Sequence, residues 1–115
     1  MLERCWFAGR RCLDVGCNEG VVSLSVAAQF GTASMRGIDI DEPLIQMACR
    51  ALERERAART EELVAARRGG RARAAEARKA AGVARALKGV QFQTVGAFGC
   101  EGAAGSGWYK GRCGG

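Results

Sequence analysis

Histidine is absent from this chain of 115 residues, and proline occurs only once. Without histidine, the six cysteines lack a common partner in zinc sites and a base that would activate a thiol as a nucleophile. They form no Cys-x-x-Cys pair, so their spacing argues against both a zinc site and a disulfide framework. We therefore expect no bound metal. We expect reduced thiols in an intracellular protein of the nucleus or cytoplasm.

Long apolar runs are also missing. No segment approaches the roughly 18 apolar residues that a membrane-spanning helix needs, and no signal peptide with a basic start, an apolar middle and a cleavage site is present. Aromatic residues make up 6% of the chain, and none lies between Arg50 and Lys88. We therefore expect no membrane partner and no stacking of single-stranded bases on residues 50–88.

Positive charge is concentrated in one segment. The chain has a formal net charge of +6, but residues 50–88 hold 12 Lys and Arg against 5 Asp and Glu, which is +7 and leaves −1 for the remainder. This segment is rich in Ala and Arg, which favour helix, and Gly69 and Gly70 lie in its middle. We predict either two exposed helical arms about a glycine hinge or a partly disordered segment. The charges of residues 50–88 form either a solvated face or a surface that holds RNA phosphates.

Strand and helix signals alternate along the first 52 residues and return near residue 90. Apolar and alternating patterns predict strands at 11–15, 34–40 and 90–95. A helix is predicted at 21–30, so dense in apolar residues that we expect burial on all sides, and another begins after Asp41, which can cap it. This order predicts an α/β fold: an incomplete Rossmann-like parallel sheet of three strands with a basic Ala/Arg-rich helical insert.

Domain boundaries follow from the same patterns. We assign residues 1–95 to one partial cofactor-binding domain, with residues 50–88 as its basic helical insert. Residues 96–115 are so rich in glycine that we expect a disordered tail.

A glycine loop follows the first predicted strand, in the stretch CLDVGCNEG from Cys12 to Gly20. In such sheets, ligands bind beyond the carboxyl ends of the strands. Gly16 and Gly20 allow a tight turn and a close approach of the backbone to a ligand, and the next helix directs its positive end toward that ligand. Asp39 lies at the end of the second predicted strand, where a carboxylate can accept hydrogen bonds from both hydroxyls of an adenosine ribose.

The loop's spacing, G-x-x-x-G, discriminates between nucleotide ligands. Asn18 occupies the place of the middle glycine in dinucleotide-binding loops, which disfavours a nicotinamide-dependent oxidoreductase. Asp14 would repel a phosphate and suit a positively charged ligand, and we also expect it to hydrogen-bond the loop amides. An adenosyl ligand with an amino acid tail and a sulfonium charge fits better. Cys17 is expected to line the loop, not to react.

The segment from Trp6 to Leu52 resembles the first motifs of class I S-adenosylmethionine-dependent methyltransferases. Within that superfamily, the runs LDVGCNEG, GIDID and LIQMACR are similar to the RNA methylphosphate capping enzymes of the bicoid-interacting-protein type. Asn18, in place of the central glycine of the more common G-C-G-x-G loop, points to this family. The resemblance implies methyl transfer from S-adenosyl-L-methionine to an oxygen of an RNA 5′ phosphate, with the 5′ end of a small non-coding RNA as partner.

The resemblance also implies roles by position. Gly16, Cys17 and Asn18 would line the methionine part of the cofactor, and Asp39 with Ile40 would hold the adenosine. Together with the residue patterns, this predicts a cofactor site of seven residues: Asp14, Gly16, Cys17, Asn18, Gly20, Asp39 and Ile40. Catalysis would be mainly positional because the sulfonium is already activated, and no catalytic residue is assigned.

Departures from the family pattern leave two functions open. Members of the family have strands four to seven, which hold the RNA phosphate and close the adenine pocket, and no such pattern follows Val95. The leading prediction is a fragment of an RNA methyltransferase. The alternative is a non-catalytic remnant that associates with RNA electrostatically through the basic helical arm.

Overall fold

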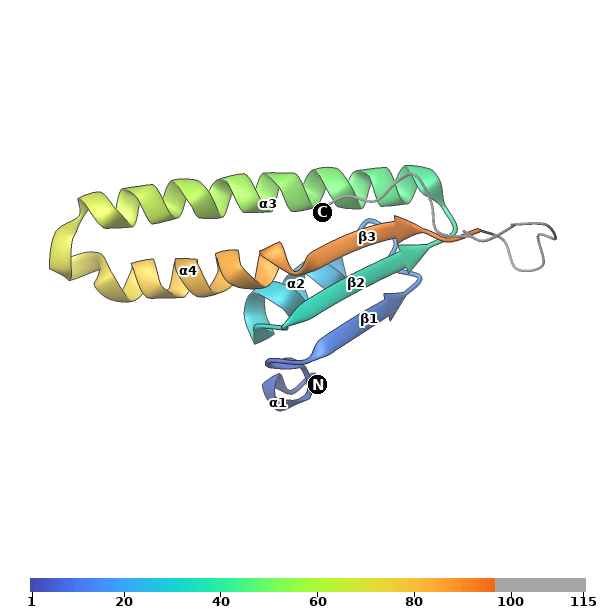
Figure 1. Cartoon of the computed structure of the whole chain (residues 1–115), viewed down its shortest axis with the longest axis horizontal. Helices are drawn as coiled ribbons and strands as arrows, with labels where there is room; N and C mark the ends of the chain where they lie inside the picture. The colour runs from blue at the N-terminus through green and yellow to red at the C-terminus, as the bar shows by residue number, and fades with distance from the viewer. Residues whose placement is uncertain (97–115) are drawn as a thin grey trace.

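The computed structural model describes residues 1–96 of the chain, and the predicted glycine-rich tail, apart from Gly96, lies outside them. Three parallel strands form an open sheet in the order β1-β2-β3: β1 (Arg11–Val15), β2 (Ser34–Asp39) and β3 (Val90–Thr94). All three strands end at the same edge of the sheet (Figure 1). The predicted α/β class and incomplete parallel sheet are confirmed, and β2 ends one residue earlier than expected.

Five helical segments accompany the strands: α1 (Arg4–Phe7), α2 (Val21–Phe30), α3 (Glu42–Arg68), the 3-10 helix η1 (Gly70–Arg73) and α4 (Ala74–Lys88). The helix ends follow local chemistry. Helix α2 ends at Gly31, whose φ of +69° is the left-handed conformation common after a helix. Helix α3 begins after Asp41, whose Oδ1 accepts a hydrogen bond from the backbone N–H of Leu44 at 3.2 Å.

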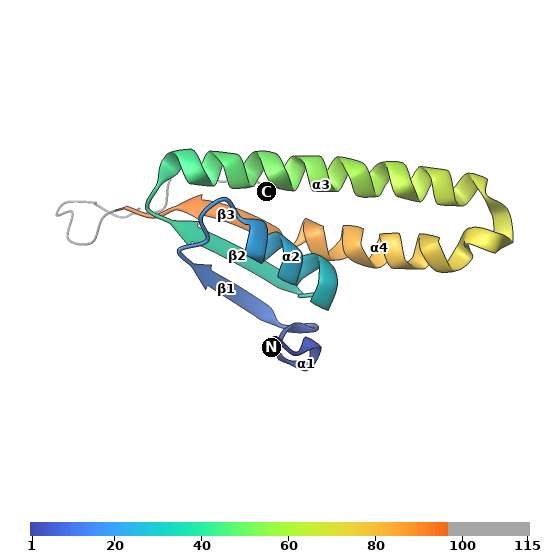
Figure 2. The same cartoon turned by 180° about the vertical axis from the view of Figure 1, so that it is seen from behind.

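Helices cover one face of the sheet and leave the other face open. Helix α2 lies behind the sheet in Figure 1 and in front of it in Figure 2. The core lies between sheet and helices and consists of Cys17, Leu24, Val26, Ala27, Met35, Ile45, Ala48, Leu52, Leu87, Val90 and Phe92. Leu13 and Val15 of β1 are exposed on the open face. Leu13 is paired with Arg36 of the neighbouring strand β2.

The expectation that the helix at 21–30 is buried on all sides is wrong. Val21 and Val22 are each 63% exposed, whereas Leu24, Val26 and Ala27 are buried. Only one side of α2 packs on this three-stranded sheet, and Val21, on another side, borders a groove described below. Apolar density alone therefore overestimated the burial of this helix.

Helices α3 and α4 form an antiparallel hairpin that extends well beyond the sheet (Figures 1 and 2). Gly69 and Gly70 lie at its turn, so the two predicted helical arms about a glycine hinge are present. Helix α3 runs unbroken through residue 50, and the basic segment therefore begins within a helix. Ala66 and Ala80 are buried in the hairpin, where small side chains allow the two helices to approach closely.

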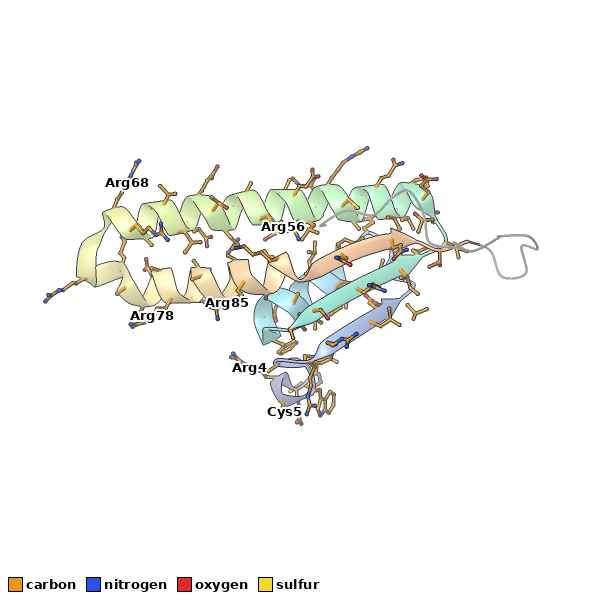
Figure 3. The ribbon with its side chains drawn as sticks, viewed as in Figure 1. Arg4, Cys5, Arg56, Arg68, Arg78 and Arg85 are labelled. Carbon is orange, nitrogen blue, oxygen red and sulfur yellow. The ribbon has the colours of Figure 1, made fainter. Side chains whose placement is uncertain are left out.

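Arg56 fastens this hairpin to the sheet (Figure 3). Its guanidinium donates hydrogen bonds to the carbonyl oxygens of Leu87 at 2.9 and 3.2 Å, Lys88 at 3.4 Å and Val90 at 3.3 Å. Leu87 and Lys88 end α4, and carbonyls at a helix end have no partner within the helix. Arg56 thus caps α4 and positions the start of β3. Its place in a basic segment gave no sign of this structural role.

Candidate cofactor-binding site

The candidate site lies where β1 and β2 end. The loop 16–20 follows β1, and its first two amides are bound to the end of β2. The backbone N–H groups of Gly16 and Cys17 both donate to the carbonyl oxygen of Ile38, at 2.8 and 3.0 Å. These hydrogen bonds hold the loop against the neighbouring strand at the edge where parallel sheets bind ligands.

Asp39 joins the loops after the two strands. Its Oδ2 accepts the N–H of Asn18 at 2.9 Å, and its Oδ1 accepts the N–H of Asp41 at 3.0 Å. Hydrogen bonds from these amides, that of Asp41 foremost, lower the pKa of the Asp39 carboxyl, because they favour its charged form. Each oxygen keeps a further lone pair. The carboxylate can therefore organise the loop and still accept two more hydrogen bonds.

Three positions of the loop have a left-handed backbone: Gly16 with φ +75°, Asn18 with φ +55° and Gly20 with φ +80°. Asparagine tolerates this conformation better than most residues because its short polar side chain can hydrogen-bond locally. Here the Oδ1 of Asn18 accepts the N–H of Glu19 at 2.8 Å. This contact explains how an asparagine can occupy a place where a glycine is more common.

The ring of Phe92 packs beneath the loop in space that two glycines leave free. A Cβ at Gly20 would lie 2.6 Å from Cζ of Phe92 and 2.9 Å from Cβ of Ala48. A Cβ at Gly37 would lie 2.6 Å from Cδ1 of the same ring. Gly20 is therefore required for packing as well as for its backbone conformation. Phe92, in β3, was not predicted to be near the loop.

Asp14 and Cys17 lie on the inner side of the site. The expectation that Asp14 bonds the loop amides is wrong: its Oδ2 accepts the hydroxyl of Ser23 at 2.6 Å, because the amides of Gly16 and Cys17 are taken by Ile38. Burial, followed by the charges of Asp14 and Asp39, raises the pKa of the Cys17 thiol to about 11. A neutral thiol is a poor nucleophile, in keeping with a lining role.

The residues predicted as a site therefore occupy adjacent loops and the strand ends below them. Ile40 follows Asp39 and is 70% exposed, although its side chain is apolar. The first backbone amides of α2, which follow Gly20, have no acceptors within the helix and are directed toward the same edge.

The thiols and carboxylates of residues 1–96 are dispersed over the fold. No group of three or more His, Cys, Asp or Glu side chains there could hold a metal ion, and no helix described there is long and apolar enough to cross a membrane. Cys5, Cys12 and Cys17 are free thiols, whereas Cys49 is disulfide-bonded. The expectation of reduced thiols is thus wrong for Cys49. Cys100 and Cys113 lie outside the described residues.

Comparison with known proteins identifies the family. Residues 1–84 match the family model of ribosomal protein L11 methyltransferase (PrmA). The chain belongs to this methyltransferase family. The match includes the glycine loop, Asp39 and most of the hairpin, so the fold described above is the first part of a methyltransferase Rossmann-like fold. Use of a methyl-donor cofactor follows from the family.

Several relatives of this chain have RNA in their names. The chain is 44% identical to "Probable RNA methyltransferase" of Arabidopsis thaliana over 46 residues. This matched segment is 40% of the chain and 14% of that protein. The chain is 54% identical over 43 residues to the 7SK snRNA methylphosphate capping enzyme of Mus musculus, 37% of this chain and 6% of that protein. It is 44% identical over 39 residues to the U6 snRNA methylphosphate capping enzyme Amus of Drosophila melanogaster, 34% of this chain and 13% of that protein.

These matches confirm the resemblance to class I methyltransferases and, within them, to RNA methylphosphate capping enzymes. The matched part spans 14% or less of the length of each of these three relatives.

Proposed function

We propose that this chain is the cofactor-binding part of an S-adenosyl-L-methionine-dependent methyltransferase that methylates an oxygen of an RNA 5′ phosphate. The observation that carries the cofactor assignment is the carboxylate of Asp39. It is fixed by the amides of Asn18 and Asp41, and both of its oxygens keep lone pairs at the ligand-binding edge of the sheet. Such a carboxylate suits the two hydroxyls of an adenosine ribose.

Neighbouring residues fit the rest of an adenosyl ligand. Ile40 exposes an apolar side chain beside the carboxylate, where it can cover the face of an adenine. The negative charges of Asp14 and Asp39 are felt inside the loop, since both contribute to the raised pKa of Cys17. A negative potential there favours a sulfonium cation and disfavours the pyrophosphate of a dinucleotide.

Methyl transfer from this cofactor requires the protein mainly to bind and orient the two reactants. S-adenosyl-L-methionine supplies a methyl group that is already activated by the sulfonium. Asp39 and Ile40 would hold the adenosine, while Gly16, Cys17 and Asn18 would line the methionine part. A phosphate oxygen is already anionic at neutral pH, so no base has to deprotonate the acceptor. Holding that oxygen in line with the methyl group is therefore the main catalytic requirement.

The acceptor is inferred from the relatives and not from the cofactor site. Relatives that are 44 to 54% identical over their matched segments are named as enzymes that act on RNA, and two of the names specify a methylphosphate cap on an snRNA. The matching family model is named for a protein substrate. An RNA acceptor implies action inside the cell, in the nucleus or the cytoplasm.

Isothermal titration calorimetry of the full chain with S-adenosyl-L-methionine tests the cofactor site. We expect saturable binding that Asp39→Ala weakens by about 1 to 3 kcal/mol, the cost of leaving buried polar groups unpaired. Asp41→Ala is the matched control, because it removes a nearby carboxylate that caps α3 and leaves that of Asp39 in place. Equal affinity of wild type and Asp39→Ala would refute the role of Asp39. Displacement by NADH would favour a nicotinamide cofactor instead.

Transfer is tested separately with S-adenosyl-L-methionine that carries a radiolabelled methyl group. We expect label in RNA with a 5′-phosphate and none in the same RNA with a 5′-hydroxyl. Label in an added ribosomal protein and none in RNA would contradict the acceptor and leave the cofactor assignment intact.

A further inference from the structure

A groove of about 890 Å³ lies on the helical side of the sheet, outside the cofactor site. Helix α2 forms one wall, and α3 and α4 form the other, a region seen from behind the sheet in Figure 2. Six charged side chains line it, of which five are cations: Arg4, Arg54, Arg59, Arg78, Lys79 and the single acid Glu55. The groove is therefore strongly positive.

Most of these cations have no partner. Arg59 is paired, with its Nη2 3.6 Å from Oε2 of Glu55 and its Nη1 3.0 Å from Oε2 of Glu62. The other four are exposed and make no hydrogen bond or ion pair to residues 1–96. Four like charges around one groove repel each other and attract a polyanion.

These charges come from separate parts of the chain. Arg4 belongs to α1, outside the basic segment 50–88, yet it lines the same groove as Arg78 of α4. Figure 3 shows both side chains on the same side of the hairpin, that of Arg4 beside α1 and that of Arg78 on α4. The fold, and not the basic segment alone, thus creates this surface.

One end of the groove adjoins the cofactor loop. Its wall follows α2 from Val21 to Gly31, and Val21 is the residue directly after Gly20 of the loop. Apolar side chains, among them Leu24 and Val83, also line the groove. A strand of nucleic acid in the groove would therefore lead toward the cofactor loop.

We propose that this groove holds the phosphate backbone of a single-stranded RNA whose 5′ end reaches the cofactor loop, an inference that rests on the function proposed above. Three of the four unpaired cations are arginines, whose planar forks bind phosphate through two parallel hydrogen bonds. The repeated charges of backbone phosphates match the like charges that α1, α3 and α4 bring to the groove. Bases stay free for readout elsewhere, since the groove offers no aromatic side chain for stacking.

The test measures how the affinity of the full chain for a short fluorescein-labelled single-stranded RNA falls with salt, by fluorescence anisotropy. Each phosphate contact on a single strand contributes about 0.7 to the slope of log affinity against log salt. The groove variant carries Arg54→Gln, Arg78→Gln and Lys79→Gln. The matched control removes three charges from the turn of the hairpin, with Arg67→Gln, Arg68→Gln and Arg71→Gln.

We expect the groove variant to lower the slope by about 2 and the turn variant to change it little. A single Arg4→Gln should lower it by about 0.7, whereas Arg36→Gln, on the open face of the sheet, should leave it unchanged. Arg4 is exposed, so this pair of variants keeps the test valid if the triple variant fails to fold.

Three outcomes would overturn the proposal. Equal loss in the groove and turn variants would assign RNA binding to the charge of the whole arm. Equal slopes in wild type and groove variant would exclude the groove. Displacement of RNA by polyglutamate at equal charge concentration would assign the groove to an acidic protein. Calorimetry with S-adenosyl-L-methionine on the same variants distinguishes a failure of the groove proposal from a failure of the cofactor proposal. The groove variants should retain the wild-type affinity for the cofactor.

Discussion

Alanine substitutions at three glycines can separate backbone strain from crowding beneath the loop 16–20. Gly16 has a φ of +75°, and a Cβ added there would have nothing within 4 Å, so Gly16→Ala introduces strain alone. Gly37 has no positive φ, but its Cβ would lie 2.6 Å from the ring of Phe92, so Gly37→Ala introduces crowding alone. Gly20 has a φ of +80° and a Cβ position 2.6 Å from the same ring, so Gly20→Ala introduces both.

The expected losses follow from these geometries. A left-handed backbone costs a residue with a Cβ roughly 1 to 2 kcal/mol, and crowding in a packed core costs roughly 1 to 3 kcal/mol. Gly20→Ala should therefore lower the free energy of unfolding by about 2 to 5 kcal/mol, a large share of the roughly 5 to 15 kcal/mol typical of a domain. Each alanine also restricts the unfolded chain by a similar amount, which cancels when the three variants are compared.

Urea denaturation of the full chain, followed by far-UV circular dichroism without cofactor, measures these losses. Phe92→Leu should relieve the crowding and not the strain, so in that background Gly37→Ala should cost less while Gly16→Ala costs the same. A loss at Gly20 no greater than that at Gly16, or no coupling between Gly37 and Phe92, would refute the packing of Phe92 beneath the loop.

Two further predictions concern Arg56 and Cys17. Arg56→Gln should lower the free energy of unfolding by about 2 kcal/mol, because carbonyls of α4 and β3 lose a charged donor. Arg85 is exposed on α4, so Arg85→Gln should leave the free energy of unfolding unchanged. Equal losses for the two variants in urea denaturation would contradict the capping role of Arg56. The pKa of the Cys17 thiol is near 9.0 in the unfolded chain and about 11 in the folded protein. Between these values unfolding releases the thiol proton, so the free energy of unfolding should fall as pH rises from 9.0 to about 11. Cys17→Ala should abolish this fall, and its persistence would assign it to another group.

Some of the site could be predicted because its causes are local. The left-handed turns at Gly16 and Gly20, the cap at Asp41 and the strand end at Asp39 each depend on a few neighbouring residues. The roles that were missed depend on residues far apart in the chain. Asp39 also fixes the loop through Asn18, which only the pairing of β1 with β2 brings near.

Errors in the predictions have the same origin. Apolar density in α2 indicated full burial, but Val22 is 63% exposed because the sheet and the neighbouring helices α1 and α4 do not surround the start of this helix. The hydrogen bond of Asp14 to Ser23 depends on how α2 lies over β1, which no local pattern specifies.

Residue order and local backbone preference were sufficient to predict three parallel strands, a glycine loop at the edge of the sheet and a basic helical hairpin. Those preferences act over one or two turns of chain, and they do not specify which distant surfaces meet. Packing decided that Phe92 lies beneath Gly20, that Arg56 caps α4 and that Arg4 joins Arg78 in one groove. Such contacts depend on strand register and on the crossing of helices, which arise only when the whole core is assembled.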